Sequence, residues 1–110
     1  MGGVSLSLIF GFVLREANMV EDHVRMTIES LAEEQGWGVW RIVFYRKKGC
    51  PDTMFIKEGR VVFIEFKDKG KVVTVLQSKV INLMRSFGAE VHANVDTVEK
   101  ACRILNLRPC

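Results

Sequence analysis

The first apolar pattern of the chain repeats at three- and four-residue steps. Between Asn18 and about Gln35, the apolar positions with this spacing are Val20, Val24, Ile28 and Leu31. Residues at these steps lie on one face of an α-helix. Asn18 followed by Glu21 also has the spacing of an N-terminal capping box. We therefore predict a helix over residues 18–35.

A second helical pattern runs through residues 74–87, where the apolar stripe consists of Leu76, Val80, Leu83 and Phe87. Thr74 and Gln77 have the spacing of another capping box at its start. Residues 96–99 have the composition of a helix start, which predicts a last helix ending near Leu105.

Four shorter runs, rich in β-branched and aromatic residues, predict strands at residues 39–45, 53–57, 60–67 and 90–95. Glu58 and Gly59 join the second run to the third, which predicts an antiparallel hairpin. A helix connects the third run to the fourth, which favours a parallel pair. The predicted fold class is α/β, a mixed β-sheet flanked by helices in the order helix, three strands, helix, strand, helix.

The length and composition are those of one globular domain. The chain has 110 residues, of which 48% are hydrophobic and 26% charged, and these values exclude disordered and collagen-like proteins. We expect a single domain over residues 19–110, preceded by an apolar arm over residues 1–18. The net charge of +3 is compatible with a nucleic-acid partner and too small to require one.

The apolar stretch of the arm, residues 4–14, has several interpretations. It is roughly half the ~20 residues that span a bilayer, and it lacks the basic start and cleavage site of a secretory signal. An extra strand or a docking arm for a dimer is the favoured interpretation. The alternatives are a disordered or wrongly assigned extension, with Met19 as the true start, and membrane association. The cysteines form no C-x-x-C pair, so we expect a cytoplasmic protein without a membrane partner.

The third predicted strand carries an acid and a base on one face. Glu65 and Lys67 are two residues apart in an otherwise apolar run, so their side chains project to the same side. Burying both is costly unless they are paired or bind an ion. Antiparallel pairing through the predicted hairpin brings the neighbourhood of Asp52 opposite them. Two carboxylates and an ammonium suit a Mg²⁺ ion that also binds water and a phosphate.

A simple salt bridge at a solvated strand end is the alternative for Glu65 and Lys67.

Cations flank the predicted site on both sides, at Arg46, Lys47, Lys48, Lys69 and Lys71. They are placed to meet DNA phosphates, or they belong to solvated strand ends. Trp37 and Trp40 are expected in the core rather than stacked on bases.

The motifs Gly49-Cys50-Pro51-Asp52, Glu65-Phe66-Lys67 and Gln77 resemble the G-x-P-D, E-x-K and Q pattern of the VRR-NUC family, which is part of the PD-(D/E)XK nuclease superfamily. The resemblance covers about residues 21–95. It implies that Asp52 and Glu65 bind Mg²⁺, for which Mn²⁺ substitutes, together with the backbone carbonyl of Phe66. It also implies that Lys67 is the catalytic lysine.

The same resemblance implies a role for two helical residues. Glu21 on the first helix would contact the metal directly or through water, and Gln77 would help to place Lys67, the water or the phosphate. For both residues a capping box is the alternative role, and one residue could serve both.

The resemblance implies a metal-dependent DNA endonuclease that hydrolyses phosphodiesters with activated water and uses no nucleotide cofactor. Small members of the family, from bacteria or phage-infected cells, look like homodimeric resolvases of four-way (Holliday) junctions. A symmetric dimer would supply two active sites for two opposed strands. A flap, fork or nicking endonuclease is the alternative with the same chemistry. A non-catalytic DNA-binding module with a nuclease fold is the alternative from another class.

Overall fold

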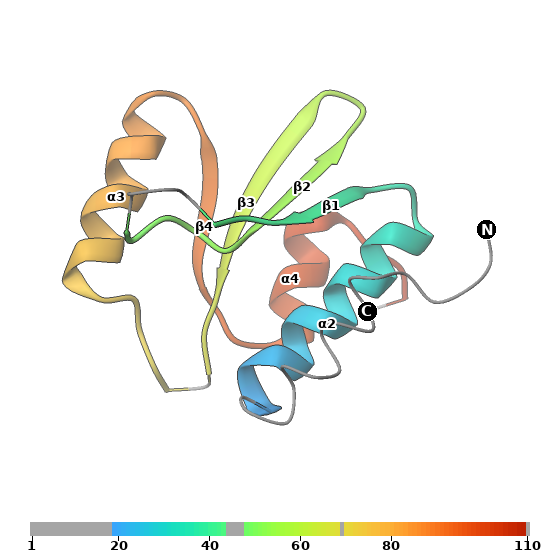
Figure 1. The fold of residues 1–110 in the computed structure, drawn as a ribbon. Coiled ribbons are helices and arrows are strands. Elements are labelled where there is room, and N and C mark those ends of the chain that lie inside the picture. Colours follow the sequence, from blue (N-terminus) through green and yellow to red (C-terminus); the bar gives the residue numbers. More distant parts are fainter. Residues whose placement is uncertain (1–18, 44–47, 69, 110) are drawn as a thin grey trace.

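The computed structural model describes residues 19–43, 48–68 and 70–109, and for residues 19–22 it describes the backbone alone. The arm at residues 1–18, and with it Asn18, lies outside this part. The described elements follow one another along the chain as α2 (Met19–Glu34), β1 (Gly38–Arg41), β2 (Thr53–Lys57), β3 (Arg60–Phe66), α3 (Val75–Ser86), β4 (Glu90–Val95) and α4 (Val98–Leu105) (Figure 1).

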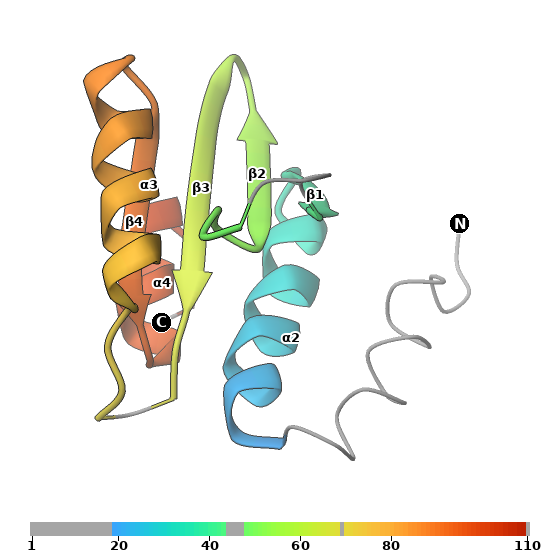
Figure 2. The same cartoon turned by 60° about the vertical axis from the view of Figure 1, so that its left-hand side comes forward.

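The strands form one mixed sheet in the order β1-β2-β3-β4. β1, β2 and β3 pair antiparallel, whereas β3 and β4 pair parallel on either side of the α3 crossover. Helices α2 and α4 pack together on one side of the sheet (Figure 1), and α3 lies across the sheet from α2, next to β4 (Figure 2). The predicted α/β class, element order and parallel pair are confirmed.

The main core lies between the sheet and the pair α2 and α4. Alternate residues of β3 point into it, because successive side chains of a strand face opposite sides. The fully buried members of this core are Ile28 and Ala32 from α2, Phe55 from β2, Val62, Ile64 and Phe66 from β3, and Ala101 from α4. Trp37 also packs there, edge-on to Phe55, as predicted. Trp40 does not, since 51% of it is exposed on the edge strand β1, and the core prediction for this residue is wrong.

The hairpin between β2 and β3 forms at the predicted residues. Glu58 and Gly59 both have positive φ, 51° and 84°, as a two-residue turn between twisted strands requires. β1 is shorter than predicted and ends at Arg41. Past Arg41 the pairing continues with a backbone hydrogen bond from the Ile42 N–H to the Asp52 carbonyl at 2.8 Å. Residues 44–47 lie outside the described part.

Helix α3 differs from the other helices in what it buries. Its predicted capping box is present, with Thr74 as the N-cap and Gln77 as its partner. Its apolar stripe, however, faces outward: Leu83 is 57% exposed and Phe87, the C-cap residue, 83%, while Ile81 is buried instead. Among the strands α3 packs on β4, so one narrow line of the helix suffices to cover it.

No helix in the described ranges has the length and apolar character that crossing a bilayer requires.

Candidate active site

The candidate site lies at the open end of the β2–β3 hairpin, opposite its Glu58-Gly59 turn. In the β2–β3 register Thr53 pairs with Ile64 and Met54 with Phe63. The next step outward places Asp52 across from Glu65. Asp52 itself precedes β2, and its carboxylate lies beside Arg25 of α2, whereas Glu65 contacts Gln77 of α3. The two predicted carboxylates therefore come from adjacent backbone positions at this end of the sheet, and each has a partner on a different helix.

The turn before Asp52 is held against α3. Gly49 has φ +86°, and a Cβ there would lie 3.0 Å from the Leu76 carbonyl oxygen and 3.0 Å from Val80. Only glycine combines that backbone conformation with so close an approach. Pro51 is fully buried. Both residues of the motif therefore have a structural task, which is to bring Asp52 to the end of the sheet.

Glu65 and Lys67 lie on one side of the strand end, as predicted. Glu65 is 5% exposed, and its Oε2 lies 3.7 Å from Lys67 Nζ. The side chain of Lys67 is 16% exposed, so the salt bridge of the alternative interpretation is present at the strand end and is largely buried rather than solvated. Between Ile64 and Phe66 the β3–β4 register shifts by one residue. The resulting bulge in β4 contains Asn94, with φ 58°, and bulges of this kind redirect neighbouring side chains.

Gln77 has two roles in the structure. Its Oε1 accepts from the Thr74 N–H at 2.9 Å, which completes the capping box, and its Nε2 donates to Glu65 Oε2 at 3.1 Å. The capping interaction fixes the first turn of α3 and with it the direction of the amide. Gln77 therefore orients Glu65 and caps the helix at once.

Two charged residues of α2 reach the site without having been predicted there. Arg25 is 3% exposed, and its Nη1 lies 3.8 Å from Asp52 Oδ2. Its Nε lies 3.9 Å from Glu29 Oε2. In sequence the pair is an ordinary i,i+4 charge pair of the kind found on solvated helix faces. The only sequence signal was its position between the core residues of α2.

Glu29 is strained electrostatically by its position. Burial raises its pKa to about 7, and the nearby guanidinium of Arg25 opposes this rise. Its Oε2 has no hydrogen-bond partner among the described residues. A carboxylate of this kind is poised between its charged and neutral forms near neutral pH.

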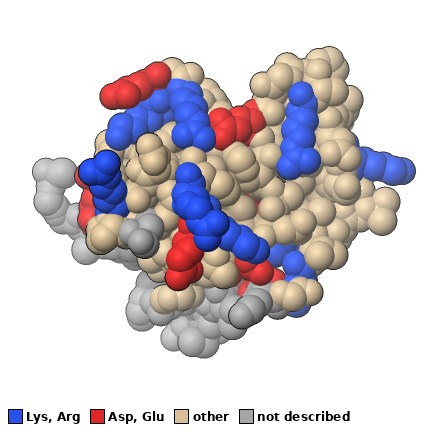
Figure 3. All heavy atoms as spheres, turned by 180° about the vertical axis from the view of Figure 1, so that it is seen from behind, with Lys and Arg blue, Asp and Glu red and all other residues tan. Residues whose placement is uncertain are grey.

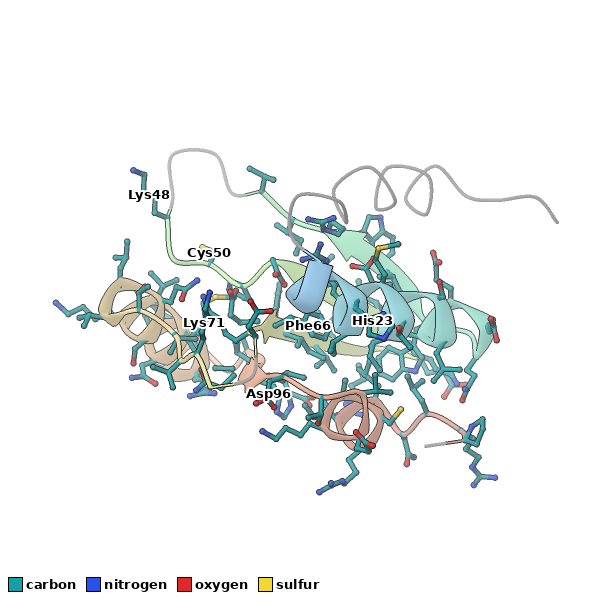
Figure 4. All side chains as sticks on the ribbon, turned by 90° about the horizontal axis from the view of Figure 1, so that it is seen from below. His23, Lys48, Cys50, Phe66, Lys71 and Asp96 are labelled. Carbon is teal, nitrogen blue, oxygen red and sulfur yellow. The ribbon has the colours of Figure 1, made fainter. Side chains whose placement is uncertain are left out.

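The other predicted site residues differ in where the structure places them. The Phe66 side chain is fully buried in the main core, so at the site it can act only through its backbone. Lys71 is exposed and pairs with Asp68 at 3.7 Å, and Lys48 is exposed and projects away from the end of the sheet (Figure 4). The Glu21 side chain and residues Arg46, Lys47 and Lys69 lie outside the described part.

The described donors fit a hard divalent cation in part. Among the described side chains no group of three or more His, Cys, Asp and Glu residues could hold a metal. Asp52 and Glu65 are nevertheless two carboxylates at the same end of the sheet, and Mg²⁺ is commonly held by one or two carboxylates and several waters. Each carboxylate has a cation at 3.7–3.8 Å, from Lys67 or Arg25.

The fold matches that of a solved structure. A solved structure described as "VRR_NUC domain" is similar to this chain with a TM-score of 0.71 and 22% sequence identity, over 78% of this chain and 94% of that one. No protein-family model matches the sequence, and no curated protein matches it. At this identity the likeness establishes a common fold with that VRR_NUC domain.

Proposed function

We propose that this chain belongs to the VRR-NUC family and is a Mg²⁺-dependent DNA endonuclease. The observation that carries the proposal is the buried Glu65 with Lys67 beside it at the end of β3, in a fold shared with a VRR_NUC domain, with Asp52 at the start of the neighbouring strand β2. A structural role alone does not account for a buried acid and a largely buried lysine at this strand end, because an apolar pair would avoid their desolvation.

Asp52 and Glu65 would hold the metal, with the Phe66 carbonyl and Glu21 as further ligands. When bound, the metal supplies Lewis acidity at the phosphate and lowers the pKa of a bound water. Lys67 donates to the attacking water or to the charge that develops on the phosphate. Gln77 holds Glu65 in one orientation, and Arg25 does the same for Asp52.

Alanine variants of Asp52 and Lys67 test this assignment. Each should lower the cleavage rate of a labelled DNA by at least about a hundredfold, while binding measured without divalent metal changes little. Lys79→Ala, an exposed lysine of α3, is the matched control and should cleave at the normal rate. Normal cleavage by Lys67→Ala would overturn the site. DNA binding by a wild-type protein that never cleaves would favour the non-catalytic module.

For the substrate we propose branched DNA, with a four-way junction cut by a homodimer. The exposed apolar residues of α3 support a second copy, because monomers rarely leave a large apolar patch uncovered. Incubation with Mg²⁺ and a synthetic junction, a flap, a fork and a linear duplex should show fastest cleavage of the junction. Faster cutting of the flap or fork would favour that alternative, and preference for the linear duplex would contradict both.

The dimer has two proposed contact regions that can be tested separately. Leu83→Asp places a charge in the exposed stripe of α3, and deletion of residues 1–18 removes the apolar arm. Light scattering gives the mass of each variant in solution. A halved mass identifies the contact region, and a wild-type protein with the mass of one chain would overturn the dimer.

A further inference from the structure

A second hollow lies outside the site, on the open edge of the sheet. This groove of about 480 Å³ is bounded by the last turn of α3, the edge strand β4 and helix α4. Its lining residues are Arg85, His92, Ala93, Asn94, Val95, Lys100, Arg103 and Ile104. Seen from behind, where α4 and β4 lie, the molecule carries Lys and Arg side chains with Asp and Glu side chains between them (Figure 3).

The groove is lined by cations and contains no acidic residue. Arg103 is exposed and forms no ion pair with a described residue. Lys100 donates to Asp96 at 2.7 Å while 52% of its side chain stays exposed. Glu99 lies one turn before Arg103 on α4 but does not line the groove. His92 also pairs with Glu90 at 2.8 Å, so the positive charge of the groove comes mainly from Arg85 and Arg103, which form no ion pair with a described residue.

Arg85 is held in place on the opposite wall. Its Nε and Nη2 donate to the Val91 carbonyl at 3.0 and 2.8 Å, which fixes the guanidinium on β4 and leaves further N–H groups for a ligand. Arg85 and Arg103 each lie in the last turn of a helix, where a cation complements the helix dipole. Helix-end stabilisation does not explain why two different helices aim their cations, together with Lys100, into one hollow.

The groove leads to the end of the sheet that carries the site. Val95 lines it and pairs with Phe66 across the β3–β4 ladder. The Lys67 N–H donates to the Val95 carbonyl at 3.0 Å. The groove and the candidate site therefore adjoin at the same end of the β3–β4 pair.

We propose that this groove binds the phosphate backbone of the DNA at a position away from the scissile phosphate. The inference rests on the proposed nuclease function and adds a second anchoring point to it. Arg103 and Lys100 contact phosphate oxygens from α4, and Arg85 does so from α3. Such contacts fix the position of a duplex and carry no base preference.

Arg103→Gln and Arg103→Glu test the groove, with Arg108→Gln and Arg108→Glu as controls. Arg108 is an exposed arginine of the same chain segment that does not line the groove. Fluorescence anisotropy with a labelled four-way junction, in EDTA and at several salt concentrations, gives the affinity. Arg103→Gln should lower the salt slope of log K by about 1, the value for one lost phosphate contact, and Arg103→Glu should weaken binding roughly tenfold. The Arg108 variants should change the affinity less than about twofold.

Equal losses for the Arg103 and Arg108 variants would overturn the groove, since net charge alone would then explain both. Cleavage at saturating DNA separates this inference from the proposed function. Arg103→Glu should cleave at the normal rate once bound. If the wild-type protein does not cleave DNA but the affinity difference persists, the nuclease proposal fails and the groove stands. If cleavage is normal and Arg103→Glu binds like the wild type, the groove fails and the nuclease stands.

Discussion

The two faces of the sheet are built for different purposes, although they share the same strands. The face toward α2 and α4 holds fully buried apolar side chains, with Val62, Ile64 and Phe66 at alternate positions of β3. The face toward α3 holds Glu65, Lys67 and Gln77. Alternation along one strand therefore directs neighbouring residues of β3 to the apolar core and to the proposed active site.

The largest expected effect compares two phenylalanines on opposite faces. Phe55 is fully buried in the main core, whereas Phe63 on the neighbouring strand is half-buried toward α3. Phe55→Ala should lower the free energy of unfolding by about 4 kcal/mol, because it leaves a cavity in a closed core. Phe63→Ala should cost about half as much or less, since water and side chains can fill the space. Urea unfolding followed by circular dichroism measures both.

Equal losses for the two variants would show that the α3 face is as closely packed as the other. Phe55→Leu, which removes less volume, provides a value if Phe55→Ala does not fold. Its cost should lie between those of the two alanine variants.

A second test concerns Glu29, an acidic residue of α2 that is buried against the sheet. The pKa of Glu29 is raised by burial to about 7 from an ordinary value of 4.5. The folded protein therefore binds the Glu29 proton more tightly than the unfolded chain, so stability falls as pH rises from about 4.5 to 7. A shift of this size corresponds to up to roughly 3 kcal/mol. Glu29→Gln removes the titration, and its unfolding free energy should vary less than that of the wild type between pH 5 and pH 8.

The charges around Glu29 also enter this test. They are Arg25, Arg41, Asp52 and Glu33. Arg25→Met is the useful companion variant, because it removes the cation that offsets the burial of Glu29 and also contacts Asp52. It should steepen the fall in stability with rising pH. Identical pH profiles for wild type and Glu29→Gln would show that Glu29 is hydrated rather than buried.

The sequence predicted the elements better than their surroundings. The hairpin, both capping residues of α3 and the span of β4 follow from local rules, since turn residues and caps act within a few positions. The burial of Arg25 and Glu29 does not follow, because an i,i+4 charge pair has the same pattern on a solvated helix and on one pressed against a sheet. The exposure of the apolar stripe of α3 could not be predicted either, since periodicity indicates a helix face but not whether another element covers it.

The site was predictable where spacing fixes geometry. Glu65 and Lys67 share a face because they are two residues apart in a strand, and Asp52 follows from the register of a tight hairpin. Arg25 required the packing of α2 against the end of the sheet, which no local pattern contains. The groove beside β4 could not be predicted from the sequence, because it forms only where β4, α3 and α4 come together.

A smaller effect separates the two roles of Gln77. Thr74→Ala removes the side chain that caps α3 and should cost about 1 kcal/mol of stability. Gln77→Met removes the cap and the hydrogen bond to Glu65. The two variants should therefore have similar unfolding free energies, while Gln77→Met alone weakens the activation of cleavage by Mg²⁺. Equal activity in both variants would limit Gln77 to capping.

The smallest expected effect concerns a partly exposed ion pair at the edge of the sheet face that packs against α2 and α4. Arg60 pairs with Glu90 at 2.7 Å, with both side chains about a third or more exposed. The hydrogen bond from Arg60 lowers the pKa of Glu90 to about 2. The stabilisation is therefore complete above about pH 4.5 and is lost as pH falls toward 2, in the opposite direction to Glu29. Solvent screening limits it to less than about 1 kcal/mol.

Arg60→Gln should lower the unfolding free energy by that amount at pH 7 and by almost nothing at pH 2. A larger loss at pH 7 would instead come from the stacking of Arg60 over Trp37, where the guanidinium carbon lies 5.8 Å from the ring centre, and Arg60→Lys would then fail to restore it.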